Sequence, residues 1–109
     1  MRVALGEFEQ LVLLAIVQLD GEVYGVPIVD EIERRTGREV TRAAVYITLR
    51  RLEEKGLVAS WMSEPTAERG GKARRCVKVT PAGLRTLKDS RDFLNLMWRG
   101  AQLKVKDAR

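Results

Sequence analysis

The sequence contains no histidine, and this absence excludes two large classes of functional site. Without histidine the chain can form neither Ser-His-Asp or Cys-His catalytic groups nor a metal site with an imidazole ligand. We find no paired-carboxylate motif and no nucleophile spaced next to a base. We therefore expect a protein that is not an enzyme and that uses no metal or cofactor.

Cysteine and long apolar runs are also scarce, and both absences bear on the cellular compartment. Cys76 is the only cysteine, so no intrachain disulfide can form, and a lone thiol suits a reducing cytoplasm. The longest apolar run, residues 11–17, is far shorter than the roughly 20 residues of a membrane span. Glu7 and Glu9 stand where a signal peptide would be basic. We expect a cytoplasmic protein with no membrane segment.

The charge is unevenly distributed over a chain whose 109 residues and 45% apolar composition fit one folded domain. Residues 1–33 hold one basic and seven acidic side chains, a net of −6, and residues 34–109 hold 19 basic and eight acidic ones, a net of +11. A basic excess confined to one part of a small chain suggests a polyanionic partner, usually nucleic acid. A solvated surface with uneven charges is the alternative.

Hydrophobic spacing predicts two helices in the acidic part of the chain. The first covers residues 6–19 and is apolar nearly all round, so we expect it to be buried on more than one side. The second covers residues 25–36 and ends before Gly37. Its apolar stripe should be buried, and its acidic residues should face outward: Asp30, Glu31 and Glu33.

A third helix, expected over residues 42–55 with Thr41 as its N-cap, has the composition of a helix that enters DNA. Its core face is formed by Val45, Leu49 and Leu52. The remaining surface is small at the entering end and basic further on, which suits a major groove about 12 Å wide. The candidate DNA-contacting residues of this helix are Thr41, Arg42, Ala43, Ala44, Tyr46, Ile47, Arg50 and Arg51.

Each of these candidates has a structural alternative. Arg50 and Arg51 could pair with Glu53 and Glu54 within the same helix instead of contacting phosphates or guanine edges. The Tyr46 hydroxyl could donate to a phosphate, or the ring could be a half-buried packing residue. Ile47 could contact a thymine methyl group, or pack under the hairpin or against a second subunit.

The pattern changes to strands after Gly56. Residues 57–63 and 74–79 are predicted to form a β-hairpin around a turn region at 65–73, with Cys76 as a small strand residue. The hairpin carries four cations that could reach the DNA backbone or minor groove: Arg69, Lys72, Arg74 and Arg75.

The chain closes on a helix that starts at Pro81 after the N-cap Thr80 and reaches Lys104 or beyond, unless Gly100 ends it earlier. A seam with heptad-like spacing runs along it: Leu84, Leu87, Arg91, Leu94, Trp98, Ala101 and Val105. A second apolar strip lies on the opposite side, so we expect one strip to meet a partner chain in a homodimer. Arg91 should pair with Glu7 or Glu9, or bind a carboxylate ligand.

The order of these elements, three helices followed by a basic hairpin, is that of a winged helix-turn-helix, and the residues carry a family resemblance. The set Tyr24-Gly25, Ile28, Ile32, Val45-Tyr46-x-x-Leu49-x-x-Leu52-Glu53-x-x-Gly56-Leu57-Val58, Trp61, Arg74-Arg75 and Val79-Thr80-Pro81-x-Gly83 resembles the PadR family of transcriptional regulators. With one helix after the hairpin, the chain resembles the short subgroup of that family.

The resemblance implies a mainly α fold with a small β-hairpin, in which residues 1–80 form a winged helix-turn-helix domain and residues 81–109 a dimerisation helix within one compact unit. It also implies a homodimer that represses a promoter at a pseudo-palindromic operator of double-stranded DNA, often relieved by a small ligand. Some short members bind flat aromatic molecules between paired tryptophans, which makes Trp98 a candidate ligand contact. The competing hypothesis is a winged-helix protein-interaction module without sequence-specific DNA binding.

Overall fold

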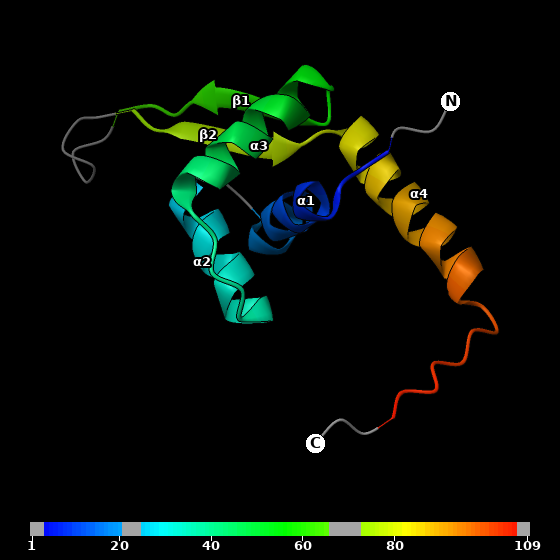
Figure 1. Cartoon of the computed structure of the whole chain (residues 1–109). Coiled ribbons are helices and arrows are strands. Elements are labelled where there is room, and N and C mark those ends of the chain that lie inside the picture. The colour runs from blue at the N-terminus through cyan, green and yellow to red at the C-terminus, as the bar shows by residue number, and fades with distance from the viewer. Residues whose placement is uncertain (1–3, 21–24, 66–72, 107–109) are drawn as a thin grey trace.

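The computed structural model describes residues 4–20, 25–65 and 73–106 and has the predicted order of elements. Three helices precede a two-stranded antiparallel hairpin, and a fourth helix follows it (Figure 1). The elements are α1 (Glu7–Leu19), α2 (Gly25–Thr36), α3 (Arg42–Glu54), β1 (Val58–Met62), β2 (Arg75–Val79) and α4 (Pro81–Trp98). The mainly α fold with a small hairpin is therefore confirmed.

Helix α1 occupies the centre of the molecule and contacts α2, α3, α4 and β2. Val12 and Leu13 are completely buried, which explains why the sequence of this helix is apolar on more than one side. Leu14 and Val17 are 44% and 43% exposed, so one flank of α1 remains open to solvent.

Helix α2 ends where the sequence predicts, at Thr36 before Gly37, whose φ of +74° is the left-handed conformation that glycine adopts most readily. The prediction that Glu31 faces outward is wrong, because its side chain is only 7% exposed. Arg35 and Arg34 donate hydrogen bonds to its carboxylate from the following turn. These bonds, Arg35 first, hold the pKa of Glu31 below its ordinary value.

Local capping fixes both ends of α3. The Thr41 hydroxyl oxygen accepts a hydrogen bond from the Ala44 amide at 3.0 Å, and Gly56 follows the helix with a φ of +77°. The predicted core face is confirmed, since Val45 and Leu52 are completely buried and Leu49 is 8% exposed. The opposite face of α3 is therefore the one available to a partner.

The hairpin joins the core at one end and extends away from it at the other. In its register Val58 lies opposite Val79, Ser60 opposite Val77, and Met62 opposite Arg75. Because side chains alternate along a strand, these six residues lie on one face of the hairpin. The three valines are buried, whereas Arg75 and Met62 are exposed. Cys76 is a completely buried strand residue, as predicted.

Helix α4 docks closely on the start of the hairpin. Thr80 caps it by accepting from the Gly83 amide at 3.0 Å and donates its own hydroxyl to the Gly56 carbonyl at 2.8 Å. A Cβ on Gly83 would lie 2.3 Å from the Leu57 carbonyl oxygen, which is far inside contact distance. Only glycine lets this turn of α4 approach the backbone so closely.

The sequence leaves two possible ends for α4, one at Lys104 or beyond and one near Gly100. The helix ends at Trp98, and Gly100 has a φ of +79°, so the prediction that it reaches Lys104 is wrong and the earlier end at Gly100 is correct. Ala101 and Val105 lie beyond the helix and cannot continue its seam. Their spacing fitted a heptad pattern, but the left-handed glycine breaks the helix first.

Two further predictions about this helix are corrected by its surroundings. Leu87 is 9% exposed and packs against the chain's own core, so it is not part of an open seam. Within one chain Arg91 pairs with neither acidic residue of α1: its Nε lies 3.4 Å from the Asp92 carboxylate. Glu7 and Glu9 are paired instead with Arg38 at 3.1 Å and Lys55 at 2.8 Å.

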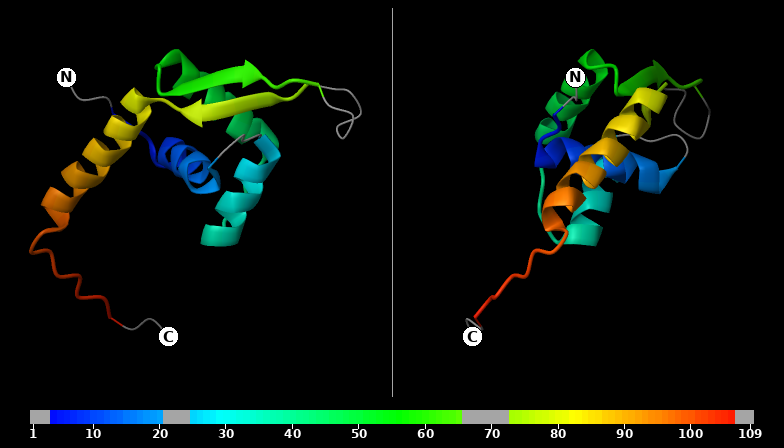
Figure 2. Two further views of the ribbon diagram at one scale, coloured as in Figure 1. Left: turned by 180° about the vertical axis from the view of Figure 1, so that it is seen from behind. Right: turned by 90° about the vertical axis from the view of Figure 1, so that its right-hand side faces the viewer.

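The distal half of α4 projects from the rest of the molecule (Figures 1 and 2). The radius of gyration is 16.6 Å, larger than the roughly 13 Å of a compact domain of this length. Large apolar side chains on this half are about half exposed or more: Phe93, Leu94, Leu96, Met97 and Trp98. No helix in the part of the chain that the structure describes is long and apolar enough to cross a membrane.

Candidate nucleic-acid interface

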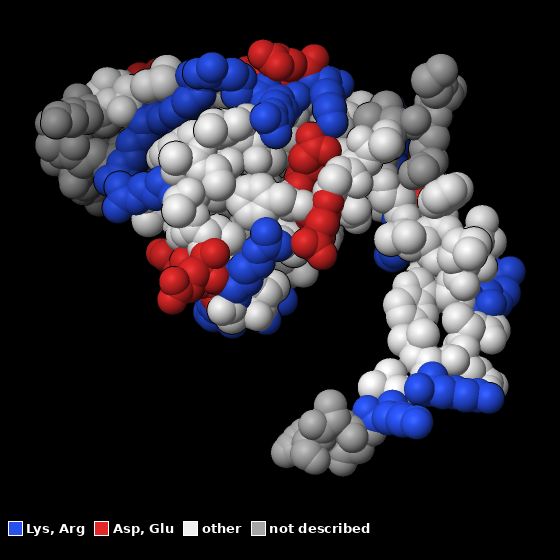
Figure 3. Space-filling view, in the orientation of Figure 1, with Lys and Arg blue, Asp and Glu red and all other residues white. Residues whose placement is uncertain are grey.

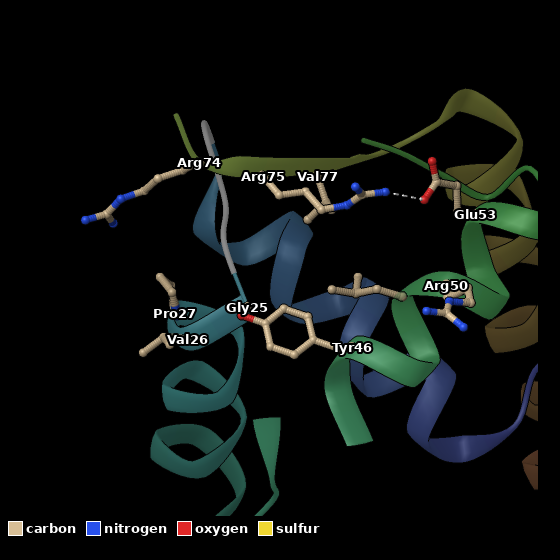
Figure 4. A pocket seen from close by; sticks show the side chains of 10 residues that line it. Gly25, Val26, Pro27, Tyr46, Arg50, Glu53, Arg74, Arg75 and Val77 are labelled. Carbon is tan, nitrogen blue, oxygen red and sulfur yellow. Dashed lines mark hydrogen bonds and ion pairs between the residues drawn. The ribbon is translucent and has the colours of Figure 1, made fainter. Parts of the chain in front are cut away.

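A cleft of about 570 Å³ lies where the start of α2, the exposed side of α3 and the outer end of β2 meet (Figure 4). The core positions all three elements around it, because α1 contacts each of them. The cleft combines apolar surface with three arginines and one glutamate, and its lining residues are Gly25, Val26, Pro27, Tyr46, Leu49, Arg50, Glu53, Arg74, Arg75 and Val77.

Cations from α3 and from the hairpin line this cleft. Arg50 comes from α3, is exposed, and makes no ion pair with any residue in the described ranges. The alternative that it pairs with Glu53 or Glu54 therefore has no support. Arg74 comes from the hairpin, is also exposed, and points away from α3 (Figure 4). Lys and Arg form a band along this side of the molecule, and acidic side chains adjoin it (Figure 3).

Tyr46 packs against the first residue of α2. A Cβ on Gly25 would lie 2.5 Å from both the ring and the hydroxyl oxygen of Tyr46, so glycine is needed for this contact. The ring remains 48% exposed and faces the cleft (Figure 4). The packing alternative for Tyr46 is thus correct for one side of its ring, and the hydroxyl stays beside the cleft, where it could donate to a phosphate.

The entering end of α3 is slim and accessible, as the sequence predicts. Arg42 and Ala43 are exposed, and Ala44 is half-buried. Ile47 is 54% exposed. An exposed apolar side chain on this face of α3 suits contact with a thymine methyl group. Thr41 has a capping role, because its hydroxyl oxygen is bonded to the Ala44 amide.

Arg51 lies in a different environment from Arg50. It lines a second cleft between α1 and α3, together with Glu7, Glu9 and Glu54. Burial raises the pKa of Glu9, but the hydrogen bonds from Lys55 and the Gly6 amide, with the positive charges of Lys55 and Arg51, outweigh that effect and leave it below the ordinary 4.5. Arg51 therefore faces acidic residues of α1 and adds a small favourable charge interaction with Glu9.

Arg75 is also engaged within the chain. Its guanidinium donates to the Glu53 carboxylate at 3.3 Å and to the Ser60 hydroxyl at 3.0 Å. Arg75 thus points toward Glu53, whereas Arg74, the residue before β2, points the other way (Figure 4). Sequence reasoning missed Ser60 and assigned Glu53 only to pairs within α3, since the pairing spans three elements. The other two predicted hairpin cations, Arg69 and Lys72, lie outside the described residues.

Comparison with known proteins identifies the family. Residues 13–89 match the model of the transcriptional regulator PadR-like family. The transcriptional regulator Rv3488 of Mycobacterium tuberculosis is 36% identical over 80 residues, which cover 73% of this chain and 70% of that protein.

Solved structures agree with this match. A PadR family transcriptional regulator from Eggerthella lenta is 28% identical with a TM-score of 0.65, covering 86% of this chain and 81% of that one. A transcriptional regulator from Clostridium thermocellum, 23% identical, shares the fold with a TM-score of 0.70 over 90% of this chain and 92% of that one. The chain therefore belongs to the PadR-like family of transcriptional regulators and is not an enzyme.

Proposed function

We propose that this regulator binds double-stranded DNA sequence-specifically through the exposed side of α3 and the cations of the hairpin. The observation that carries the proposal is that Arg50 of α3 and Arg74 of the hairpin line the same cleft, beside the slim end of α3. Arg50 can read guanine edges, Ile47 can contact a thymine methyl group, and Arg74 can bind phosphate. In this proposal residues 1–80 form the DNA-binding unit, acting in the cytoplasm.

We further propose that the active form is a homodimer joined through α4, which acts as a repressor at a pseudo-palindromic operator. The support is the apolar surface on the distal half of α4, where Leu94 and Trp98 are 51% and 56% exposed. Single soluble chains seldom leave such a patch uncovered. A two-fold dimer presents two α3 helices to half-sites about one or two helical turns apart. Repression follows where such an operator overlaps a promoter.

Trp98 is proposed as a dimer contact first, because tryptophan is enriched in interfaces and neither of the two clefts described above includes it. In the ligand-responsive form of the same proposal, a flat aromatic effector stacks between the Trp98 rings of the two subunits. A thermal-shift screen of aromatic cations and phenolic acids distinguishes the two, since only the second form predicts a ligand-dependent rise in melting temperature that Trp98→Ala abolishes.

The direct test is selection of bound fragments from a random DNA library, followed by footprinting on the selected site. We expect a pseudo-palindromic protected site whose two halves are separated by about one or two turns. The protein-interaction alternative predicts no enriched sequence, together with one acidic partner in a pull-down and no salt-dependent DNA binding. That result would replace the DNA proposal.

A further inference from the structure

Three polar side chains from three different elements form a closed hydrogen-bonded group at the back of the cleft. Glu53 belongs to α3, Ser60 to β1 and Arg75 to β2. The Ser60 hydroxyl donates to Glu53 at 2.8 Å and accepts from Arg75 at 3.0 Å, and Arg75 donates to Glu53 at 3.3 Å. We call this group the hairpin triad. It joins both strands of the hairpin to the C-terminal turn of the helix proposed to enter DNA.

The hairpin triad lies just beyond the buried part of the hairpin. On the hairpin face that carries it, Val58, Val77 and Val79 are buried and fix the base of the hairpin. Further out, Ser60 and Arg75 occupy diagonal positions on the same face, within side-chain reach of each other. Because Arg75 is the first residue of β2, it is the outermost strand residue that ties β2 to α3. The direction of the outer hairpin relative to α3 therefore depends on it.

The triad is too exposed to add much to folding. Arg75 and Glu53 are 63% and 41% exposed, and an exposed ion pair typically adds between about 0 and 1 kcal/mol. Its acid also stands in a cleft that is otherwise cationic, where a carboxylate repels phosphate. The charge of this glutamate by itself lowers the affinity for DNA. Orienting the hairpin is a role that would offset this loss.

We propose that Glu53 and Ser60 are positioning residues: they hold Arg75 and so fix the angle at which the hairpin meets DNA relative to α3. Arg75 is then part of the support, and Arg74 beside it is the cation that contacts phosphate. This inference rests on the proposed DNA binding. It adds that an acidic residue of the interface strengthens binding, although its own charge opposes it.

The test compares two adjacent glutamates of α3. Glu54 is exposed and has no hydrogen bond or ion pair with any residue that the structure describes, so it serves as the matched control. Removing its charge with Glu54→Gln should leave the affinity for the selected operator unchanged or raise it. Glu53→Gln removes the same charge but should weaken binding by about threefold to fivefold, because fewer molecules hold the hairpin in the binding orientation. Ser60→Ala should weaken binding to a similar extent.

A second comparison separates Arg75, the first residue of β2, from Arg74, which precedes the strand. Arg74→Gln should reduce the slope of log affinity against log salt by about 1, as loss of a phosphate contact does. Arg75→Gln should weaken binding with an unchanged slope, and the double variant Glu53→Gln/Arg75→Gln should bind no more weakly than Arg75→Gln alone. The inference is overturned if Glu53→Gln strengthens binding as Glu54→Gln does, or if Arg75→Gln lowers the slope.

A measurement on the free protein keeps this result distinct from a failure of the DNA proposal. The Ser63 amide donates to the Arg74 carbonyl at 2.7 Å, just beyond the triad, and its hydrogen exchange reports how well the outer hairpin is held. Exchange at Ser63 should be about threefold to fivefold faster in Glu53→Gln and unchanged in Glu54→Gln. Equal exchange in both variants contradicts the inference. A wild-type chain that binds no DNA contradicts the proposed function instead.

Discussion

At the scale of single residues, adjacent side chains of the same type have different surroundings. Arg50 opens on the cleft beside the hairpin, whereas Arg51 lies with three acidic residues between α1 and α3. Helical rotation of about 100° per residue is enough to separate the two guanidinium groups. Charge totals taken from a sequence therefore overstate how many cations are available to DNA.

Arg50→Ala is expected to lower affinity for the selected operator by about tenfold to a hundredfold and to relax the preference for one base pair, since a bidentate contact to a base contributes about 1–3 kcal/mol of discrimination. Competition binding against single-base operator variants measures both effects. Arg85→Ala, which removes an exposed cation from α4, is the control and should change affinity little. Uniform weakening on every operator variant would show that Arg50 contacts only phosphate.

Some residue roles could be predicted from the sequence because they are local. Thr41 caps α3 through a bond to a residue three positions away, so the helix start follows from the chain itself. The burial of Glu31 could not be predicted from periodicity, because it depends on two arginines of the next turn covering the carboxylate. Predicting the Glu53–Ser60–Arg75 group would have required the hairpin register and the angle of the hairpin to α3, and sequence spacing gives neither.

At the scale of elements, one glycine allows the start of α4 to pack closely against the hairpin, and another glycine ends the helix. Gly83 allows the first turn to contact the Leu57 carbonyl, and Gly100 stops the helix after Trp98. Both glycines are visible in the sequence. Only the structure distinguishes the one that permits packing from the one that ends the helix, because the distinction depends on neighbours and on the sign of φ.

Gly83→Ala is expected to destabilise the fold by about 1–3 kcal/mol. Helix propensity alone predicts the opposite sign, a gain of about 1 kcal/mol, but the new methyl group meets a backbone oxygen that no side-chain rotation can move. Urea unfolding gives the free energy of unfolding. Asp89→Ala, at an exposed position of the same helix, should change it by no more than about 0.5 kcal/mol. A stability gain for Gly83→Ala would contradict the close packing.

The Glu9–Lys55 bridge ties α1 to the end of α3 and should make stability depend on pH. The folded-state pKa of Glu9 lies below its ordinary 4.5, so the bridge stabilises the fold above that value. This contribution is lost as the pH falls through the folded-state pKa. Glu9→Gln should therefore flatten the fall in unfolding free energy below about pH 5. Lys55→Gln should have the same effect, and the double variant should be no flatter. Wild-type and Glu9→Gln curves of equal slope would contradict the pKa shift.

At the scale of the whole molecule, the fold pairs some of the charges that are unevenly spread along the sequence and places others at the cleft. The acidic residues Glu7 and Glu9 are neutralised inside the chain by Arg38 and Lys55. Arg50 and Arg74 line the cleft where α3 and the hairpin meet. The apolar half of α4 extends from another part of the molecule, so DNA and a second subunit would not compete for the same surface (Figure 1).

The dimer proposal predicts that the apolar patch of α4 is covered in solution. Sedimentation should show a dimer at about 50 µM, where a modest specific interface remains assembled. Leu94→Glu places a charge in the patch and should give a folded monomer with weaker operator binding, since two half-sites are no longer held together. Arg85→Glu, at an exposed position nearer the start of the same helix that forms no ion pair with any residue the structure describes, is the control for added negative charge. A wild-type monomer at that concentration would contradict the proposal.

The most direct test of DNA recognition by α3 and the hairpin is the ratio of two affinities at about 150 mM salt, one for the selected operator and one for a scrambled duplex of the same length and composition. Specific recognition predicts a ratio of about a thousand or more, with affinity falling steeply as salt rises. A ratio near one would mean that the cations of this cleft bind DNA only as a polyanion, or do not bind it, and would contradict the proposed function.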